Sequence, residues 1–372
     1  MSAQKPWSRR GFLSARGLGA TTGGLVAALV PQPPKRVRVS GKTFQHWCVS
    51  RRAMGCEFTV MVPPDQPKPM ASAEAALDEI GELEDLLSVY RADSAISRVN
   101  QSAAESPVRV NYRLYELLKR AADLTEQTEG AFDAGAGALV RAWGFLRGPR
   151  RVPTDTERQE ALARCGIRHV VLDDETASVR YLVSGLEVNF GSIGKGYGID
   201  QALKRMVTDF GTDCVLIQGG RSSIRAIGSP AGDNRGWVIG LQDPFNPDHQ
   251  LGSVCLKDRG LATSSIVNQH FEADGRRYGH LIDPRTGWPA DHLASATVLA
   301  PDATIADALS TALFVMGLDK AADFCHNHRE IAALLVRRQD QEAGQDTLPR
   351  VVTFNLPPED VELTSGDDPP GL

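Results

Sequence analysis

Amphipathic helices and short strands follow one another in this chain without strict alternation. Apolar residues recur at helical spacing over residues 71–88, 112–126 and 197–210. Short apolar segments such as residues 58–62 and 214–218 have the length and composition of strands. Because a doubly wound parallel sheet requires regular alternation of strand and helix, the pattern predicts an α+β fold in a single large domain.

The C-terminal half is predicted to contain most of the strands. A helix is expected to begin after Asp302, a suitable N-cap, and to end at Gly317. Residues 90–100 are expected to form a polar loop. Further strands are expected within residues 168–190 and near residues 224–228, 237–242, 252–256, 296–300, 331–336 and 350–354.

The charge of the chain argues against nucleic acid as a partner. The 372 residues carry a formal net charge of −5, and residues 1–30 contain four basic residues and no acid. The charge beyond residue 30 is therefore −9, whereas a general nucleic-acid binder needs a basic face. Past residue 40 no apolar run reaches the length of a membrane-spanning helix.

The N-terminus has the pattern of an export signal. Ser8-Arg-Arg-Gly-Phe-Leu13 matches the twin-arginine motif, and a mild Gly/Ala-rich run follows it. This predicts export to the periplasm or to the outer face of the cytoplasmic membrane. The alternatives are an uncleaved segment that associates with the membrane, or a frayed basic end without a targeting role.

These features divide the chain into four predicted parts. Residues 1–30 are assigned to the signal, and the Pro-rich residues 31–45 to a linker. Residues 46–356 are assigned to the folded domain, and residues 357–372 to a mobile acidic tail.

A glycine-rich turn, Asn189-Phe-Gly-Ser-Ile-Gly-Lys-Gly196, follows a predicted strand and opens a helix. Backbone N–H groups at such a position can hold phosphate. It is not a Walker P-loop, because Gly196 follows Lys195 where that motif requires Ser or Thr. From the residues alone, phosphate contact and tight packing explain this turn equally well.

Asp307 and Thr311 stand four residues apart on a predicted helix, so their oxygens face one side. Mg²⁺ prefers such oxygen ligands and keeps waters and substrate phosphates in its shell. The alternative is an Asp that is stabilised by the helix dipole near the N-terminus, beside an ordinary helical Thr.

His280 lies in Tyr278-Gly-His-Leu-Ile-Asp-Pro-Arg-Thr-Gly-Trp-Pro289, which contains the turn Asp283-Pro-Arg-Thr-Gly. Its imidazole titrates near neutral pH and can act as an acid or a base. A histidine that is only hydrogen-bonded within the turn is the alternative.

Seven segments, taken in order, resemble the FAD:protein FMN transferases, also called ApbE-like proteins. The resemblance extends from Arg52 to Val336. The seven segments are Met54-Gly-Cys, Leu87 to Asn100, the block of Gly130 to Asp133 with Trp143 to Phe145, Asn189 to Asp200, Ala262 to Ser264, His280 to Pro289, and Ala306 to Thr311.

The resemblance implies an ApbE-like mixed sheet with packed helices and a flavin cleft. It implies that FAD is a substrate, bound with Mg²⁺ at its diphosphate. FMN would be transferred to a Thr or Ser hydroxyl of an exported acceptor protein, and AMP would leave. An FAD-binding carrier without turnover and an Mg²⁺-dependent FAD diphosphatase are the alternatives that we retain.

The resemblance also assigns roles to individual residues. Asp307, Thr311 and the backbone carbonyl of Ser192 match metal ligands, and His280 matches a histidine beside the phosphate to be transferred. The positions that match flavin or adenine contacts are Met54, Tyr90, Ala131, Phe132, Asp133, Asn189, Lys195, Thr263 and Ile282.

Four parts of the chain depart from the family pattern, and one of them is Ser192, which replaces a small Gly or Ala. Asn189 stands where an Asp is usual, which removes one negative charge near the flavin. Residues 218–223 contain Arg221-Ser-Ser in place of the usual Asn-x-Gly-Gly-Asp pattern, and Ser265 and Ile266 replace Gly-Asp. Because the metal pair and His280 are present, we expect a divergent active member.

The twin-arginine pattern predicts how the signal responds to mutation. Arg9→Lys combined with Arg10→Lys should leave the full-length chain in the cytoplasm, because the pattern requires both arginines. Fractionation of cells that produce the variant measures this. Arg16→Lys, a matched change outside the motif, should not alter the distribution, and unchanged export of the double variant would mean a different route.

Overall fold

The computed structural model describes residues 35–39, 42–230, 234–246, 248–266, 269–338 and 350–363. The chain divides into one unit spanning Met1–Pro33 and a second spanning Pro34–Leu372. All the described elements belong to the second unit, and the predicted twin-arginine segment lies outside the described residues. Among the described helices, none combines the length and the apolar character that a membrane crossing requires.

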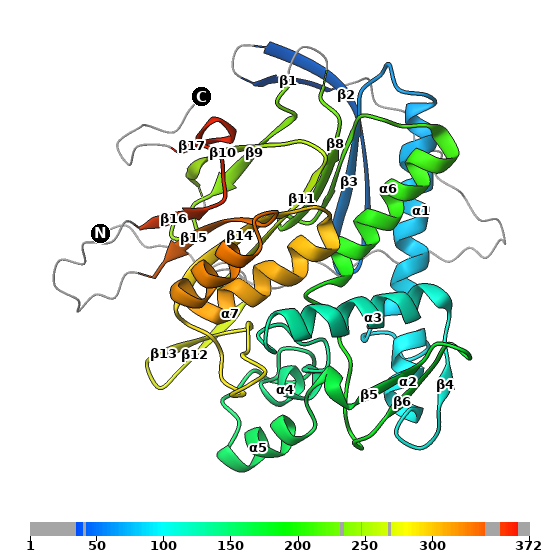
Figure 1. The fold of residues 1–372 in the computed structure, drawn as a ribbon, viewed down its shortest axis with the longest axis vertical. Coiled ribbons are helices and arrows are strands. Elements are labelled where there is room, and N and C mark those ends of the chain that lie inside the picture. Colours follow the sequence, from blue (N-terminus) through cyan, green and yellow to red (C-terminus); the bar gives the residue numbers. More distant parts are fainter. Residues whose placement is uncertain are drawn as a thin grey trace, which may run out of the picture. The chain divides into compact units, whose positions relative to one another are not determined.

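A nine-stranded sheet forms the centre of this unit (Figure 1). Its neighbouring strands are all antiparallel, and Met54-Gly55 forms a two-residue turn between the second and third strands. The strands in spatial order are β1 (Lys35–Val39), β2 (Lys42–Ala53), β3 (Cys56–Val62), β7 (Val215–Gly219), β8 (Ser223–Ile227), β11 (Arg259–Ser265), β14 (Leu293–Ala300), β15 (Ala332–Arg337) and β16 (Val351–Phe354).

Three helices cover one face of this sheet: α1 (Pro69–Leu87), α6 (Gly194–Phe210) and α7 (Ala303–Asn327) (Figure 1). The helical period of α1 places Leu77 and Ile80 in a buried cluster with strand residues such as Val60. Burial of these apolar side chains stabilises the layer, because each fully buried aliphatic side chain contributes about 1.5–3 kcal/mol.

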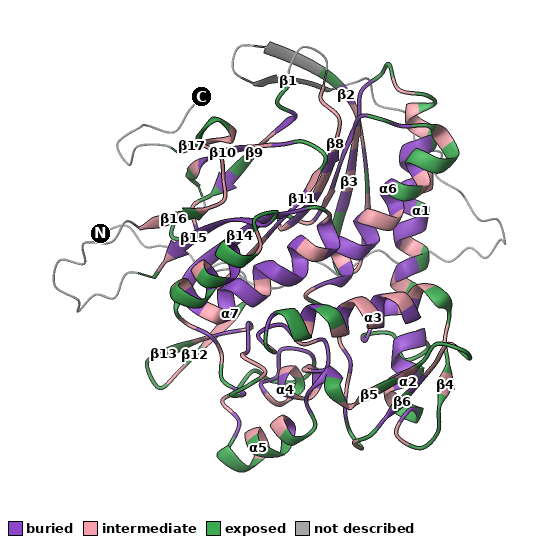
Figure 2. Ribbon diagram, viewed as in Figure 1, coloured by how far each residue is buried: buried purple, intermediate pink, exposed green. Residues whose placement is uncertain are grey.

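A smaller three-stranded sheet covers the opposite face. It contains β17 (Val361–Leu363), β10 (Gln250–Leu256) and β9 (Trp237–Gln242), in that order. Its apolar side chains form a separate buried cluster with residues of β7, β8, β11, β14 and β15. Figure 2 shows that the buried residues follow the central strands and the sheet-facing sides of the helices. The central strands are therefore covered by helices on one face and by the smaller sheet on the other.

The remaining elements extend beyond these layers. They are α2 (Ala95–Ser102), α3 (Tyr112–Gln127), α4 (Gly137–Ala142), α5 (Asp155–Ala163), the 3₁₀ turns η1 (Ile167–His169) and η2 (Pro358–Asp360), the small sheet of β4 (Val108–Arg109), β6 (Ser178–Tyr181) and β5 (Val170–Asp173), and the hairpin of β12 (His270–Ala273) and β13 (Arg276–Gly279).

The α+β class is confirmed, but several local predictions were wrong. The main sheet is antiparallel throughout its described pairs rather than mixed. The expected loop at residues 90–100 contains the start of α2, because Ser94 caps the helix by accepting the N–H of Ser97 at 3.1 Å. By contrast, the helix that begins after Asp302 is broken at Gly317, as predicted, where φ is 77°. A second helical stretch then continues α7 to Asn327, and its Phe324 and Cys325 pack into the core.

The predicted linker and tail also form structure within the described residues. β1 and the first residues of β2 pair within residues 31–45, and β17 lies within residues 357–372. Both segments add a strand to the edge of a sheet. Backbone hydrogen bonds to the edge of a sheet can stabilise a strand whatever its side chains are. The charge and proline content of these two segments therefore did not predict their strands.

Candidate functional site

The first turn of α6 lies directly against the first turns of α7. The Gly196 N–H donates to Asp307 Oδ2 at 3.0 Å. A Cβ atom on residue 196 would lie 2.1 Å from the Ala303 carbonyl oxygen, so only glycine permits this approach. The predicted glycine-rich turn therefore serves as a close packing surface that places the positive N-terminal end of α6 beside a carboxylate.

The Asp307 carboxylate is buried, with 4% of the residue exposed. Ser223 Oγ donates to Oδ1 at 3.0 Å, and Lys195 Nζ lies 3.4 Å from the same oxygen. A buried charge is tolerated only when it is paired and hydrogen-bonded, and these contacts meet that requirement. The structure thus brings Lys195 and Asp307 together, although they are 112 residues apart in the sequence.

Hydroxyl groups of α7 and β11 extend this cluster towards Thr311. Ser264 Oγ lies 2.9 Å from Ser310 Oγ and 3.2 Å from Thr311 Oγ1. Ser310 Oγ also donates to the Asp307 backbone carbonyl at 2.9 Å. Ser223, Ser264 and Ser310 were missed as site residues, because the sequence does not show which face of a strand points to a helix.

Two carboxylates hold the N-terminus of α7, which carries the candidate metal ligands. Asp302 caps the helix by accepting the Ile305 N–H at 2.8 Å, as predicted, and it pairs with Arg120. Asp200 of α6 accepts the N–H groups of Ala303 at 3.0 Å and of Thr304 at 2.8 Å. Burial, and then the charge of Asp302, raise the pKa of Asp200 to about 6, although its hydrogen bonds oppose that shift.

His280 follows β13 and is half-buried. Its Nδ1 lies 3.1 Å from the Gln269 carbonyl oxygen, which only accepts hydrogen bonds. Nδ1 therefore carries the proton of the neutral ring, and Nε2 is the acceptor. Burial lowers the pKa of His280, the positive charges of Lys195 and Arg150 lower it further, and the bond to Gln269 opposes these effects.

Met54 occupies a strained backbone position. Its φ is 48° in the turn between β2 and β3, a region that non-glycine residues adopt rarely and that often marks functional sites. The side chain packs on α6, where a Cβ on Gly198 would lie 3.3 Å from Met54 Cε. Met54 therefore lies beside the helix that carries Lys195.

The segment Ala131–Asp133 offers mainly its backbone. Ala131 and Phe132 are each 1% exposed within the core. Asp133 Oδ1 accepts the N–H groups of Gly135 at 2.7 Å and of Ile167 at 2.9 Å, and burial raises the pKa of this carboxyl. The Asp133 carboxylate is thus committed to holding two loops together.

Asn189 lies beside that segment, because its N–H donates to the Ala134 carbonyl at 2.8 Å. Its Oδ1 accepts the Gly191 N–H at 2.9 Å, which tightens the turn that carries Ser192 towards α6. Ile282 is buried and packs with Trp143, so its side chain is part of an aromatic cluster.

Tyr90 differs from the other predicted flavin contacts because it is 64% exposed. The Arg147 guanidinium donates to the Tyr90 carbonyl at 2.9 Å and to the Val89 carbonyl at 3.1 Å. The backbone is therefore held, while the phenol ring remains accessible to a ligand.

Thr263, which was predicted as a flavin contact, points to the opposite face of the sheet from Asp307. Its Oγ1 lies 2.8 Å from Thr297 Oγ1, on the face covered by β9 and β10. Successive residues of a strand point to opposite faces, so Ser264 reaches α7 and Thr263 cannot.

Among the residues that the structure describes, no group of three or more His, Cys, Asp or Glu side chains could hold a metal. The candidate metal site has a different composition, with one carboxylate at Asp307, the hydroxyl of Thr311 and the carbonyl of Ser192. These donors are all oxygens, which is the ligand type of hard cations such as Mg²⁺.

Comparison with known proteins places the chain in one family. The sequence model of the ApbE family matches residues 54–335. A protein of Treponema pallidum named FAD:protein FMN transferase is 34% identical over 287 residues, which is 72% of this chain and 79% of the relative. A protein of the same name from Haemophilus influenzae is 32% identical over 333 residues, or 86% of this chain and 92% of the relative.

Solved structures show the same similarity. The ApbE protein of Thermotoga maritima superposes with a TM-score of 0.73 and 33% identity, covering 79% of this chain and 94% of that protein. The flavinyl transferase ApbE of Pseudomonas stutzeri superposes with a TM-score of 0.71 and 30% identity, covering 84% of this chain and 94% of that protein.

The raised pKa of Asp200 predicts a pH-dependent stability. A carboxyl whose folded-state pKa of about 6 exceeds its ordinary 3.8 binds protons more tightly when folded. Its contribution to stability is therefore full below pH 3.8 and is lost as the pH rises to about 6. Asp200→Asn removes the titrating carboxyl. As the pH rises from 3.8 to about 6, the parent should therefore lose unfolding free energy relative to the variant, and urea titrations at several pH values measure this difference. A constant difference between the two proteins would contradict this assignment.

Proposed function

Because the chain belongs to the ApbE family, we propose that it is a transferase that moves FMN from FAD to an acceptor protein. The observation that carries this proposal is the contact between Lys195, at the start of α6, and Asp307 of α7, which stands one helical turn before Thr311. A positive helix end and a lysine favour a diphosphate, and the oxygen ligands favour the cation that accompanies it.

The proposed reaction is a displacement at phosphorus. The hydroxyl oxygen of an acceptor Thr or Ser forms a bond to the phosphorus on the FMN side of the diphosphate. The bond from that phosphorus to the oxygen of AMP breaks, and AMP leaves with the bonding electron pair. The hydroxyl proton passes to a base, so charge and atoms balance.

The donors fit Mg²⁺, and Asp307, Thr311 and the Ser192 carbonyl would hold it. When bound, such a cation neutralises diphosphate charge and polarises the phosphoryl group. Asp307 contributes the only carboxylate of this donor set, and its other contacts keep it oriented. The dependence on Mg²⁺ is part of the proposal.

We assign the proton transfer to His280. Its Nδ1 is held by the Gln269 carbonyl, which leaves Nε2 as an acceptor. The lowered pKa keeps the ring neutral near pH 7, the state that can accept the hydroxyl proton. Lys195 acts electrostatically on both His280 and Asp307, so the base and the metal ligand share one positive neighbour.

We propose the flavin contacts from the exposure of the side chains that could reach a ligand. The exposed ring of Tyr90 can stack on an isoalloxazine, because aromatic faces stack in offset arrangements. Met54 offers a soft apolar surface beside α6. The other predicted flavin contacts have side chains that already pack in the core or hold turns, so we propose that their backbone atoms contact the flavin. These residues are Ala131, Phe132, Asp133, Asn189 and Ile282.

We also propose that the reaction takes place after export by the twin-arginine route, so that the acceptor would itself be an exported protein. The support is the Ser8 to Leu13 pattern alone.

Loss of the metal-binding carboxylate should abolish transfer. Asp307→Asn keeps the shape of the side chain and removes its charge, so transfer should fall by about 10²–10³-fold or more. The measurement mixes the purified full-length variant, FAD and Mg²⁺ with exported proteins from source cells that lack this gene, and follows covalent flavin by in-gel fluorescence. Asp319→Asn, an exposed change on the same helix, is the matched control.

Circular dichroism establishes that the Asp307 variant is folded. Normal flavin transfer by a folded Asp307→Asn protein would remove this residue from the reaction. AMP and free FMN released by the parent protein without any acceptor would identify a diphosphatase, and bound FAD without turnover would identify a carrier.

Loss of the proposed base should slow transfer without loss of FAD. His280→Ala should reduce the rate by about 10²–10⁴-fold, the usual contribution of general acid–base catalysis. Because the pKa of His280 is lowered from 6.5, the acidic limb of the parent's kcat/KM profile should lie below pH 6.5 and be absent from the variant.

His326→Ala, an exposed change near the end of α7, should match the parent in both measurements. If His280→Ala lost FAD binding in proportion to activity, the residue would serve binding instead of proton transfer.

A further inference from the structure

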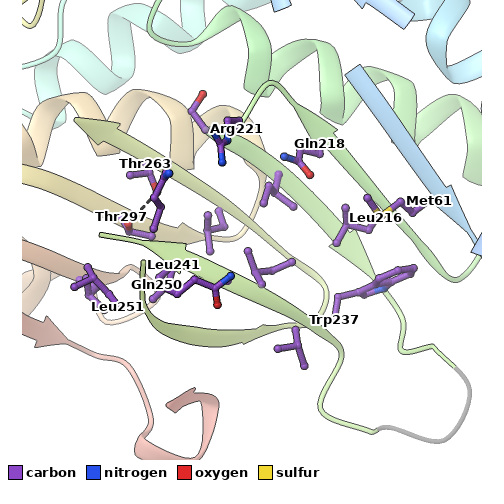
Figure 3. Close-up of a pocket in the computed structure, with 18 of the residues that line it drawn as sticks. Met61, Leu216, Gln218, Arg221, Trp237, Leu241, Gln250, Leu251, Thr263 and Thr297 are labelled. Carbon is purple, nitrogen blue, oxygen red and sulfur yellow. Dashed lines mark hydrogen bonds between the residues drawn. The ribbon is translucent and has the colours of Figure 1, made fainter. Parts of the chain in front are cut away.

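A cavity of about 590 Å³ lies between the nine-stranded sheet and the strands β9 and β10. Figure 3 shows side chains of both layers directed into it, with Thr263 and Thr297 towards one end and Trp237 at the other. Interiors of proteins are normally packed as densely as organic crystals. A space of this size has the volume of a small-molecule site rather than of a packing defect.

Part of the cavity wall is apolar, although polar side chains such as Gln218 and Gln250 also line it. Leu216, Ile224 and Leu261 contribute from the large sheet, and Ile239 and Leu241 contribute from β9. All five are buried and belong to the cluster between the two sheets. This part of the wall suits an occupant with an apolar body.

One corner of the cavity is lined by hydroxyl groups from two neighbouring strands. Thr263 lies opposite Thr297, and Ser265 lies opposite Ser295, in the register of β11 and β14. The Thr263 and Thr297 hydroxyls bond to each other at 2.8 Å. Ser295 is buried, yet its hydroxyl has no hydrogen-bond partner within the described part of the chain, so it remains available to a ligand.

Arg221 lies at the rim beside this corner. It belongs to the turn between β7 and β8, and the next residue, Ser222, accepts the Thr263 N–H at 2.8 Å. The Arg221 side chain is exposed and makes neither a hydrogen bond nor an ion pair with the residues that the structure describes. Figure 3 shows it on the same side of the cavity as Gln218.

The carboxylates of the lining do not neutralise this arginine. Asp243 and Asp248 belong to the turn between β9 and β10. Asp243 pairs with Arg350 at 2.6 Å, and Asp248 is exposed. The unpaired positive charge is therefore next to the hydroxyl corner.

We propose that this intersheet cavity binds a small amphipathic organic anion, with its apolar body between the sheets and its acidic head group at Arg221 and the hydroxyl corner. A guanidinium and hydroxyl groups are the donors that recognise an acidic head group. The site is separate from the proposed flavin site, because Thr263 and Ser264 point to opposite faces of β11. The proposal does not depend on the proposed function.

The probes are sodium decanoate and 1-decanol, which share an apolar chain and differ in charge. Each is titrated into the purified full-length protein by isothermal calorimetry. Decanoate should bind saturably, with a Kd at least tenfold lower than that of decanol, because only the anion engages the guanidinium. Arg221→Gln should raise the decanoate Kd by about tenfold or more and leave the decanol Kd unchanged.

Arg180→Gln, an exposed arginine on the separate strand β6, is the matched control and should change neither Kd. Ser295→Leu fills the corner and should weaken both probes; if it fails to fold, Arg221→Gln, which is at the surface, still decides the question. FAD binding by Arg221→Gln should equal that of the parent, which separates this site from the flavin site. No saturable binding of decanoate, equal affinity for decanol, or equal effects of the two arginine variants would overturn the proposal.

Discussion

The buried carboxylate of Asp307 is the interaction on which the arrangement of the site depends. It receives the Gly196 N–H from α6, the Ser223 hydroxyl from β8 and the charge of Lys195. A carboxylate with this little exposure is stable only while its partners are in place. The same contacts therefore hold two helices and a strand together and orient the group that is proposed to bind the cation.

The surrounding structure supports that carboxylate from several directions. Asp200 and Asp302 satisfy N–H groups at the start of α7, which would otherwise lack partners. Two carboxylates at one helix end repel each other, and Arg120 offsets part of that repulsion. The kink at Gly317 lets the second half of α7 follow the core, so the first half can keep its position against α6.

The sheet separates two environments. Ser264 points to α7 and the candidate metal site, whereas Thr263, its neighbour in the chain, points to the cavity between the sheets. The sequence predicted the α7 N-cap at Asp302 correctly, and it placed Asp307 and Thr311 on one helix, but it did not show that Lys195 contacts Asp307. The face to which Thr263 points could not be predicted, because a sequence shows the alternation along a strand but not which face meets which layer.

The sequence by itself determined the α+β class, the main helices, and the residue types that suit a diphosphate and a hard cation. Periodicity and capping are local properties, so a short segment carries them. Only the tertiary structure decided that the glycine-rich turn packs on Asp307, that Ser223 and Ser264 complete the cluster, and that the edge strands β1 and β17 form. These features depend on contacts between segments that are far apart in the chain. Neither segment alone contains the information that such a contact forms, because its energy depends on both.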